Sequence, residues 1–224
     1  MHKVIFDLIP LIVGAAVVPL YSIAVLLLLQ SKGGLFKAVA FVTGGIIVRL
    51  VQGILLGLVV GAACEASSEA GPRLIVSTLL LITGILLLVT AFKQWRGQDD
   101  SDAPTPQWMI AIVGLTAIKA VGAGALFVTI AVKQWVFTLS AIGVISEAGP
   151  GGIANVGAYL FYVIGTQSLV LVPILAYAVA PHQTAKPLKA AQAWLERHNR
   201  QIVIVMSLIV GAWFLIKGIT GLIA

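Results

Sequence analysis

The sequence predicts an all-α integral membrane protein, in which six transmembrane helices form two inverted three-helix repeats with short interfacial helices. Three observations lead to this fold class. Hydrophobic residues make up 60% of the 224 residues and charged residues only 10%, whereas about a quarter of an ordinary soluble domain is charged. Apolar runs of roughly 20 residues or more, the length that crosses a bilayer as a helix, recur along the chain. Most lysines and arginines lie at the ends of those runs.

The predicted spans are the apolar windows that remain when the chain is divided at its polar segments. They cover residues 4–30, 35–62, 73–95, 120–147, 152–180 and 201–223. Between the third and fourth spans, Arg96–Gln107 is rich in aspartate and proline, which is typical of an exposed loop. Trp108–Thr116 is short and apolar with a tryptophan at its start, and Lys186–Arg200 repeats apolar residues at helical spacing. Both segments are therefore predicted to be helices in the membrane interface.

These elements divide the chain into three parts. Residues 1–95 form the first three-helix repeat, and residues 96–119 form a cytoplasmic loop with an interfacial helix. Residues 120–224 form the second repeat, which includes the amphipathic segment 186–200.

The two halves share a local pattern that favours the repeat. In each half a glycine pair, Gly33-Gly34 or Gly151-Gly152, opens the second helix. Aligning the pairs places Arg49 opposite Gln167, each fifteen residues further on. Inverted three-plus-three repeats are a common transporter design, because two half-bundles can rock about a central site. The alternative is that two apolar segments align at glycine pairs by chance.

The basic residues predict the orientation of the chain, because lysine and arginine concentrate in cytoplasmic loops. With alternate connections counted separately, one side carries Lys32, Lys37, Lys93, Arg96, Lys119, Lys186, Lys189, Arg197 and Arg200. The other side carries Lys3 and Arg73, together with Glu65, Glu69 and Glu147. We therefore predict a multi-pass protein of the cytoplasmic membrane with both termini outside. The net charge of +6 reflects this topology rather than nucleic-acid binding.

Two cations fall midway through predicted spans, Arg49 in the second and Lys133 in the fourth. A charge at that depth costs roughly 2.5–3.5 kcal/mol on insertion scales, so it is kept only with a partner or a water-filled cavity. No aspartate or glutamate occurs at the same depth, and Asp7 is near the outer end of the first span. Arg49 and Lys133 are therefore predicted to bind an anionic substrate. The alternative is that both cations bond backbone carbonyls freed at helix breaks, or extend toward the interface.

Four further residues are predicted to belong to this site. Pro19 cannot donate to the helix ladder, so it should kink or break the first helix at mid-depth and aim backbone dipoles at a substrate. A simple packing kink is the alternative. Gln52, Asn155 and Gln167 are plausible polar neighbours of the cations, although each could equally bond a neighbouring helix. Lys217, in the last span, is expected to extend to the outer interface.

Other kinds of site lack the residues that they need. The three histidines lie outside the apolar runs, so no metal site is expected, and a single cysteine, Cys64, excludes an internal disulfide or a dithiol pair. No carboxylate, serine or histidine stands with an orienting partner at one depth, so we expect no enzyme. No nucleotide-binding loop is present, and no cofactor is expected.

Several local strings resemble a known family. PLYSIAVLLLL (Pro19–Leu29), KQWRG (Lys93–Gly97), QWMIAIVGLTAIKAVGAG (Gln107–Gly124), the segment Lys186–Asn199 and the terminal KGITGL are similar to the GAP, or peptidoglycolipid-addressing, family of bacterial membrane proteins. That family includes the sulfolipid-addressing protein and is similar to the lysine-exporter (LysE) superfamily. The resemblance implies a six-span transporter or transport accessory that moves glycolipids. Where the family usually has Asn-Pro-Lys, this chain has Ala131-Val132-Lys133, without the helix-breaking proline.

These observations predict a transporter or exporter component of the bacterial inner membrane. It would move a lipid, a glycolipid or another anionic amphipathic substrate through a midplane site. Two alternatives stay open: a small-solute exporter of the lysine-exporter type, and a scaffold that assists a lipid exporter without transporting. The expected partners are membrane lipids and the substrate, and the sequence leaves open a homo-oligomer or a larger exporter complex.

Overall fold

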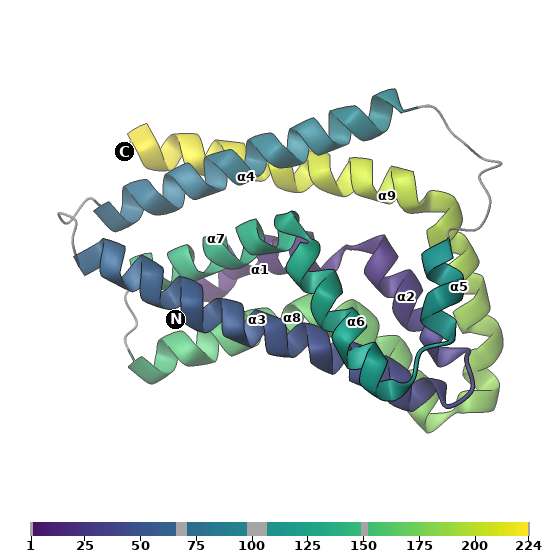
Figure 1. Ribbon diagram of the computed structural model, residues 1–224. Coiled ribbons are helices and arrows are strands. Elements are labelled where there is room, and N and C mark those ends of the chain that lie inside the picture. The colour runs from purple at the N-terminus through teal and green to yellow at the C-terminus, as the bar shows by residue number, and fades with distance from the viewer. Residues whose placement is uncertain (1, 66–70, 98–106, 149–151, 224) are drawn as a thin grey trace.

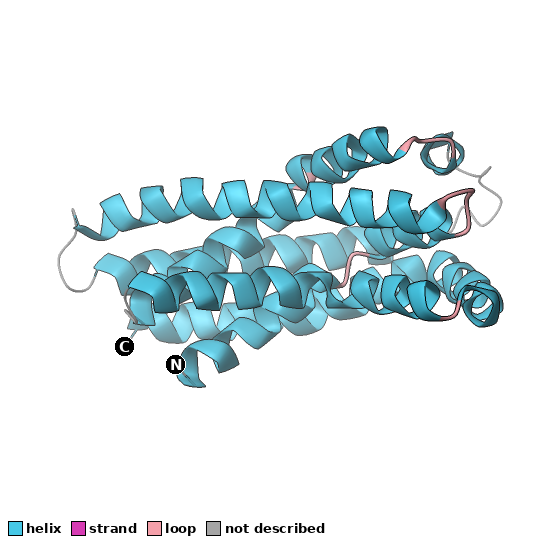
Figure 2. Cartoon of the chain, turned by 90° about the horizontal axis from the view of Figure 1, so that it is seen from below, coloured by secondary structure: helices cyan, strands magenta, loops and turns pink. Residues whose placement is uncertain are grey.

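The computed structural model describes residues 2–65, 71–97, 107–148 and 152–223. Within these residues every regular element is an α-helix, which confirms the predicted all-α class (Figure 1; Figure 2). The helices are α1 (His2–Ala16), α2 (Pro19–Leu29), α3 (Gly34–Glu65), α4 (Gly71–Arg96), α5 (Gln107–Val113), α6 (Ala117–Ile130), α7 (Val132–Ala148), α8 (Gly152–Val179) and α9 (Pro181–Ile223). Residues 98–106 of the predicted loop, Glu69 and Gly151 lie outside the described residues.

The helices have the length and hydropathy of membrane spans. In the described part of the chain, four of them (α3, α4, α8 and α9) can each cross a bilayer alone. The predicted first and fourth spans are instead pairs of shorter helices. Helices α1 and α2 meet at an angle of 62°, and α6 and α7 meet at 73°. The chain is therefore of the multi-pass membrane type, with two of its apolar segments broken.

The break in the first apolar segment confirms the prediction made from Pro19. This proline begins α2, and Val18 before it has an extended backbone with φ −121° and ψ 91°. A residue that precedes proline is pushed out of the helical region, and proline itself fits the first turn of a helix. Pro19 therefore ends α1 and starts α2 at the same point.

One predicted boundary is wrong. The amphipathic segment 186–200 and the last span form a single helix, α9, rather than two. No glycine or proline stands between Pro187 and Gly211, so the helix continues where the side chains change from polar to apolar, although Figure 1 shows α9 changing direction between its first and later parts. The first part of α9 packs against α2, and Figure 1 shows the later part beside α4. The predicted helix at 108–116 is present as α5.

The bundle has two unequal layers. Helices α4 and the later part of α9 pack along each other in one layer, while α1, α3, α6, α7 and α8 form the other (Figure 1). At the far end of α4, Arg200 of α9 donates hydrogen bonds to the carbonyls of Gln94, Trp95 and Gly97. These carbonyls have no partner further along their own helix, so the arginine ties the two helices together. Both chain termini lie at the opposite end of the bundle (Figure 1).

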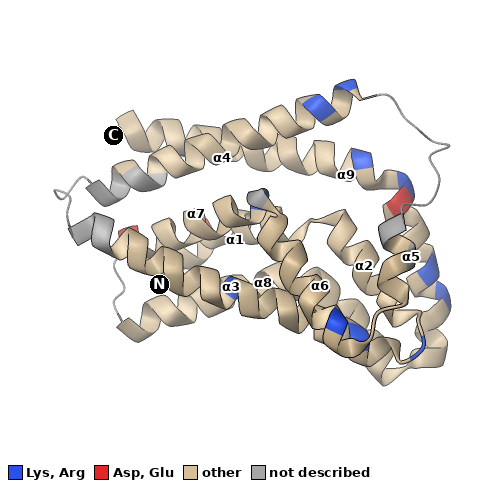
Figure 3. Cartoon of the chain, in the orientation of Figure 1, with Lys and Arg blue, Asp and Glu red and all other residues tan. Residues whose placement is uncertain are grey.

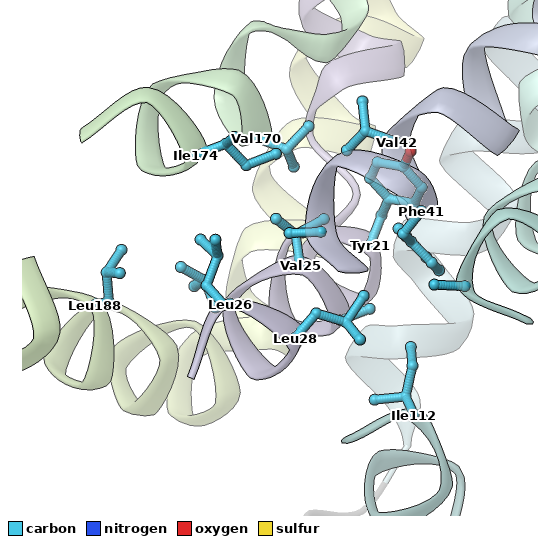
Figure 4. Packing of buried hydrophobic residues seen from close by; sticks show 14 of the residues in the cluster. Tyr21, Val25, Leu26, Leu28, Phe41, Val42, Ile112, Val170, Ile174 and Leu188 are labelled. Atoms are coloured by element: carbon cyan, nitrogen blue, oxygen red, sulfur yellow. The ribbon is translucent and has the colours of Figure 1, made fainter. Parts of the chain in front are cut away.

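Helix α2 is enclosed by other helices. Its residues Val25, Leu26 and Leu28 are buried, and Figure 4 shows them between side chains from four other helices. Those side chains are Phe41 and Val42 of α3, Ile112 of α5, Val170 and Ile174 of α8, and Leu188 of α9. A helix that is apolar all round suits such a central place. Most of the half-helix after Pro19 is thus buried against its neighbours and fixed by packing.

Helices α3 and α6 approach closely through glycines. A Cβ atom added at Gly124 would collide with the carbonyl of Phe41, and one added at Gly44 would collide with the carbonyl of Val121. Small residues allow backbones to meet in this way, and membrane helices use them for packing. The contact fixes α6 against α3 just before the chain bends into α7.

Candidate functional site

Arg49 lies in the middle of α3 and is only 3% exposed. Its Nη2 donates a hydrogen bond of 3.0 Å to Oε1 of Gln134, while its Nε and Nη1 are buried without a partner among the described residues. A buried charge that is not matched by an opposite charge is strongly destabilising unless something compensates it. Among the described residues, the hydrogen-bond partner of the Arg49 guanidinium is a neutral amide, and no carboxylate compensates its charge.

The carbonyl of Ala15 explains why Gln134 stands where it does. In an unbroken helix this carbonyl would accept from the N–H of residue 19, but Pro19 has no N–H. The side-chain Nε2 of Gln134 donates to it instead, at 3.1 Å. Gln134 is 5% exposed and stands in the first turn of α7. It therefore joins the break of the first apolar segment, the break of the fourth, and Arg49.

The α6–α7 break also supplies its own hydrogen bonds. The chain bends at Ala131, which has φ −72° and ψ 84°, outside the helical region. The freed carbonyl of Thr129 accepts a hydrogen bond of 2.9 Å from the indole of Trp135, and the N–H of Gln134 donates to the carbonyl of Ala131 at 2.7 Å. Side chains and a short turn thus replace the missing helix bonds.

Lys133 stands at this break but faces different neighbours from Arg49. Its Nζ lies 5.8 Å from the centre of the Phe137 ring, a cation–π arrangement. It makes no hydrogen bond or ion pair with a described residue. Phe137 is fully buried and packs edge-on against Phe214 of α9. Lys133 is next to Gln134 in α7, and Gln134 bonds Arg49, so the two predicted cations are close in the fold. No contact among the described residues joins the two cations directly.

Several polar side chains around Arg49 are buried without hydrogen-bond partners. Gln52, one turn further along α3, is 1% exposed, and both atoms of its amide are unpartnered among the described residues. The Tyr162 hydroxyl lies close to the Arg49 guanidinium and to the Thr138 hydroxyl, yet none of these approaches has hydrogen-bond geometry. Buried polar groups are normally hydrogen-bonded, so this cluster has donors and acceptors to offer a ligand or water.

Gln167 belongs to the same surroundings through Tyr21. The Tyr21 hydroxyl lies close to the Gln167 amide and within electrostatic range of Arg49. Gln167 is 1% exposed, and its Nε2 has no partner among the described residues. The structure therefore brings Arg49, Gln52 and Gln167 toward one polar region between α2, α3, α7 and α8. We call this region, with Gln134, Thr138 and Tyr162, the Arg49 cluster.

Tyr159 of α8 fixes the backbone of Arg49. Its hydroxyl donates to the Arg49 carbonyl, and its ring lies directly over Gly53. Any side chain at position 53 would collide with that ring. The absence of a side chain at Gly53 thus makes room for the tyrosine, and the tyrosine holds α8 against α3 beside the arginine.

The remaining predicted residues lie further from Arg49. Asn155 stands one turn before Tyr159 on α8, with its Oδ1 buried and unpartnered among the described residues. Pro19 is buried and acts through the backbone, by freeing the Ala15 carbonyl. Lys217, predicted to extend to the outer interface, forms an ion pair of 2.7 Å through its Nζ with Asp7 of α1. The sequence did not predict this partner.

Gln134 and Tyr162 were not predicted from the sequence. A glutamine or tyrosine in an apolar run carries no charge and so gives no strong signal. One signal does exist for Gln134: a proline within an apolar segment always orphans the carbonyl four residues before it. The sequence thus indicates that Ala15 needs a donor, although the donor comes from a residue 119 positions away.

Most basic residues of the described chain gather at the end of the bundle opposite to the termini. Figure 3 marks their positions at the end of α4, the start of α6 and the first part of α9. Lys32, Lys119, Lys186 and Lys189 are exposed there, and Lys37 donates to the carbonyl of Val113 in α5. This distribution matches a membrane protein with one strongly basic face.

A bundle of long apolar helices with a polar, positively charged centre defines a multi-pass membrane protein with an internal polar site. The match to a known family is specific: the chain belongs to the Sap, sulfolipid-1-addressing protein family (SfLAP), whose model matches residues 8–220. This confirms the predicted sulfolipid-addressing family and indicates a bacterial membrane protein. No curated protein and no solved structure matches the chain.

Proposed function

We propose that this protein is a transporter or exporter component that moves an anionic amphipathic lipid across the cytoplasmic membrane, with Arg49 as the group that holds the anion. The family takes its name from a sulfolipid, and the helices are those of a membrane protein, so a role in lipid export is supported at that coarse level. The finer role in transport rests on the Arg49 cluster.

The observation that carries the proposal is the free hydrogen-bonding capacity of a buried arginine. Nε and Nη1 of Arg49 lack partners among the described residues, as do the amide of Gln52 and the hydroxyl of Tyr162. Arginine binds sulfate and phosphate groups through its rigid fork of donors. An anionic headgroup would neutralise the guanidinium and satisfy these groups together. Lys133, at the neighbouring break, adds a second positive charge to the same part of the bundle.

The proposed topology has six spans, with each bent pair counted as one crossing. The pairs α1–α2 and α6–α7 would then open two inverted repeats, residues 1–95 and 120–224, and both termini would lie outside. Two features support this arrangement: the termini share one end of the bundle, and the basic residues gather at the other (Figure 1; Figure 3). The proposal involves no enzymatic step, and the energy source would be an ion gradient or a partner protein.

Translocation of a matched lipid pair in proteoliposomes tests this function. The probes are a fluorescent (NBD-labelled) sulfated galactosylceramide and its unsulfated counterpart, which differ only in the sulfate, and dithionite quenching reports which leaflet holds each probe. Wild type should move the sulfated lipid faster than protein-free vesicles do. Arg49→Gln removes the charge, so it should slow the sulfated lipid by about tenfold or more and leave the unsulfated lipid unchanged.

Lys217→Gln is the matched control, because Lys217 is also a cation within a span but is paired with Asp7. It should retain sulfate-selective movement. Equal movement of the sulfated lipid by wild type and Arg49→Gln would overturn the role of Arg49. No movement by wild type would favour a scaffold, and efflux of labelled amino acids instead of lipid would favour the small-solute exporter.

A further inference from the structure

We propose that Gln134 is a positioning residue that couples the state of Arg49 to the α1–α2 break, so that binding of an anion at Arg49 changes the geometry of the first apolar segment. This inference rests on the proposed function, because it concerns the same anion site. It adds a residue and a route by which occupancy of that site would move a helix.

The side chain of Gln134 must accept one hydrogen bond and donate another. Its Oε1 accepts from Nη2 of Arg49 at 3.0 Å, and its Nε2 donates to the carbonyl of Ala15 at 3.1 Å. A carboxamide carries an acceptor and a donor on one rigid planar group without a net charge. A hydrophobic residue would make neither bond, and a glutamate would make only the first. Because the same planar amide makes both hydrogen bonds, a rotation of that amide that weakens the bond to Arg49 also disturbs the bond to Ala15.

The carbonyl at the far end of this link has no substitute donor in the helix. Pro19 removes the N–H that Ala15 would otherwise use. The nearby backbone N–H groups of Val17 and Val18 donate elsewhere, to Val13 and Ala16. The hydrogen bond from Gln134 is therefore what joins the end of α1 to the start of α7 at this carbonyl. Its loss leaves the α1 end without that tie.

The near end of the link responds to charge. An anion at the free Nε and Nη1 of Arg49 accepts stronger hydrogen bonds than a neutral amide oxygen does. The guanidinium turns toward the anion, and its bond to Gln134 weakens. Gln134 then loses its orientation toward Ala15, and the α1–α2 break loses one of the restraints on its angle. Coupling of this kind is reciprocal, so a change at the break alters the affinity of Arg49 for the anion.

Transport kinetics separate this role from direct binding. In the proteoliposome assay, Gln134→Leu should lower the maximal rate for the sulfated lipid by about tenfold, with the half-saturating lipid fraction unchanged or lower. Gln134→Glu should raise the half-saturating fraction by about tenfold as well, since its carboxylate competes with the substrate for Arg49. Trp135→Phe is the matched control. It removes a hydrogen bond from the same α6–α7 break without touching Arg49 or Ala15, so both parameters should stay within about twofold of wild type.

A distance measurement gives a readout that a purely structural role would not change. Spin labels at Phe6→Cys on α1 and Lys32→Cys beyond α2, both exposed, report the angle of the break by pulsed electron resonance in a Cys64→Ala background. Adding the sulfated galactosylceramide should shift the distance distribution in wild type but not in Gln134→Leu. The unsulfated lipid should shift neither.

The outcomes are distinguishable. If wild type moves the sulfated lipid selectively but Gln134→Leu keeps its rate and its distance shift, the coupling role of Gln134 is wrong while the Arg49 site stands. If wild type shows neither selective movement nor a shift, both proposals fall together. Should Gln134→Leu fail to fold, Gln134→Glu keeps the shape of the side chain, and wild-type values in that variant would equally overturn the coupling.

Discussion

Two apolar segments of this protein are broken near their middle, one with a proline and one without. The α1–α2 pair bends by 62° at Pro19, whereas the α6–α7 pair bends by 73° at Ala131, in the sequence Ala131-Val132-Lys133. The first break follows from one residue, because proline forces its predecessor out of the helix. The second has no such local cause. Its sharper bend must come from contacts made elsewhere in the bundle.

Those contacts are visible on both sides of Ala131. Before it, α6 is held against α3 where Gly44 and Gly124 let the backbones meet. After it, Trp135 bonds the carbonyl of Thr129, and Gln134 bonds Arg49 and the end of α1. A proline break is thus encoded locally, while this one is encoded by tertiary packing. Three predictions test that difference.

The largest effect is expected from Gly124→Ala. The added Cβ would collide with the backbone carbonyl of Phe41, and backbone cannot yield as a flexible side chain can. Separating α6 from α3 should destabilise the protein by roughly 1–3 kcal/mol, the usual cost of overpacking, and should release the second break. Thermal unfolding in detergent, followed by intrinsic fluorescence, measures the loss of stability.

Gly122→Ala is the control for this change. It stands on the same helix, and nothing lies within 4 Å of its added Cβ. Because alanine is the better helix former, this variant should be neutral or slightly stabilising. If the two variants unfold at the same temperature, the α3–α6 contact does not support the break and the comparison fails.

A smaller effect on stability, but a clear one on shape, is expected from Pro19→Ala. The new N–H can bond the Ala15 carbonyl, so the first apolar segment should straighten and Gln134 should lose its acceptor. The free energy of unfolding should change by only about 1 kcal/mol, since one hydrogen bond replaces another. Spin labels at Phe6→Cys and Lys32→Cys, in the Cys64→Ala background, should move further apart.

Pro173→Ala provides the comparison, because Pro173 lies inside the unbroken helix α8. The distance between the same two labels should not change in that variant. An unchanged distance in Pro19→Ala as well would mean that tertiary packing, rather than the proline, holds the first break, and the two breaks would then be alike.

The sequence predicted the fold where the cause is local. Apolar windows placed the first five spans within a few residues of the observed helices, with each bent pair taken as one segment, and Pro19 located the first break. The second break was not predicted, since Ala131-Val132-Lys133 contains no helix breaker and the fourth span was expected to continue through Lys133. The joining of segment 186–200 to the last span was also missed. A change from polar to apolar side chains does not by itself end a helix.

In the candidate site, too, the residues with a local signal were predicted and the contacts made by tertiary packing were not. Arg49 and Lys133 could be found because a charge in an apolar run is conspicuous, and the polar Gln52 and Gln167 followed from Arg49. The bond between Gln134 and Ala15 could not be found, because it links residues 119 positions apart and neither residue is charged. The ion pair between Lys217 and Asp7 could not be found for the same reason: Asp7, at the other end of the chain, comes beside Lys217 only in the folded bundle.

The smallest effect is expected when a proline is added to the α6–α7 break, which lacks the one found at the α1–α2 break. Val132 is the first residue of α7, the position at which proline is best tolerated, and Ala131 before it already has a non-helical backbone with ψ 84°. Val132→Pro should therefore stabilise the protein by about 0.4–1 kcal/mol, by restricting the unfolded chain without disturbing the folded one. The same substitution inside α6, Ala125→Pro, should cost about 3 kcal/mol, because it removes a helix bond.

A small rise in the unfolding temperature for Val132→Pro would mean that tertiary contacts already hold the backbone in the form that a proline prefers, so that packing and a local breaker reach the same geometry. A loss of stability comparable to that of Ala125→Pro would mean instead that the α6–α7 break has a geometry that no proline can supply.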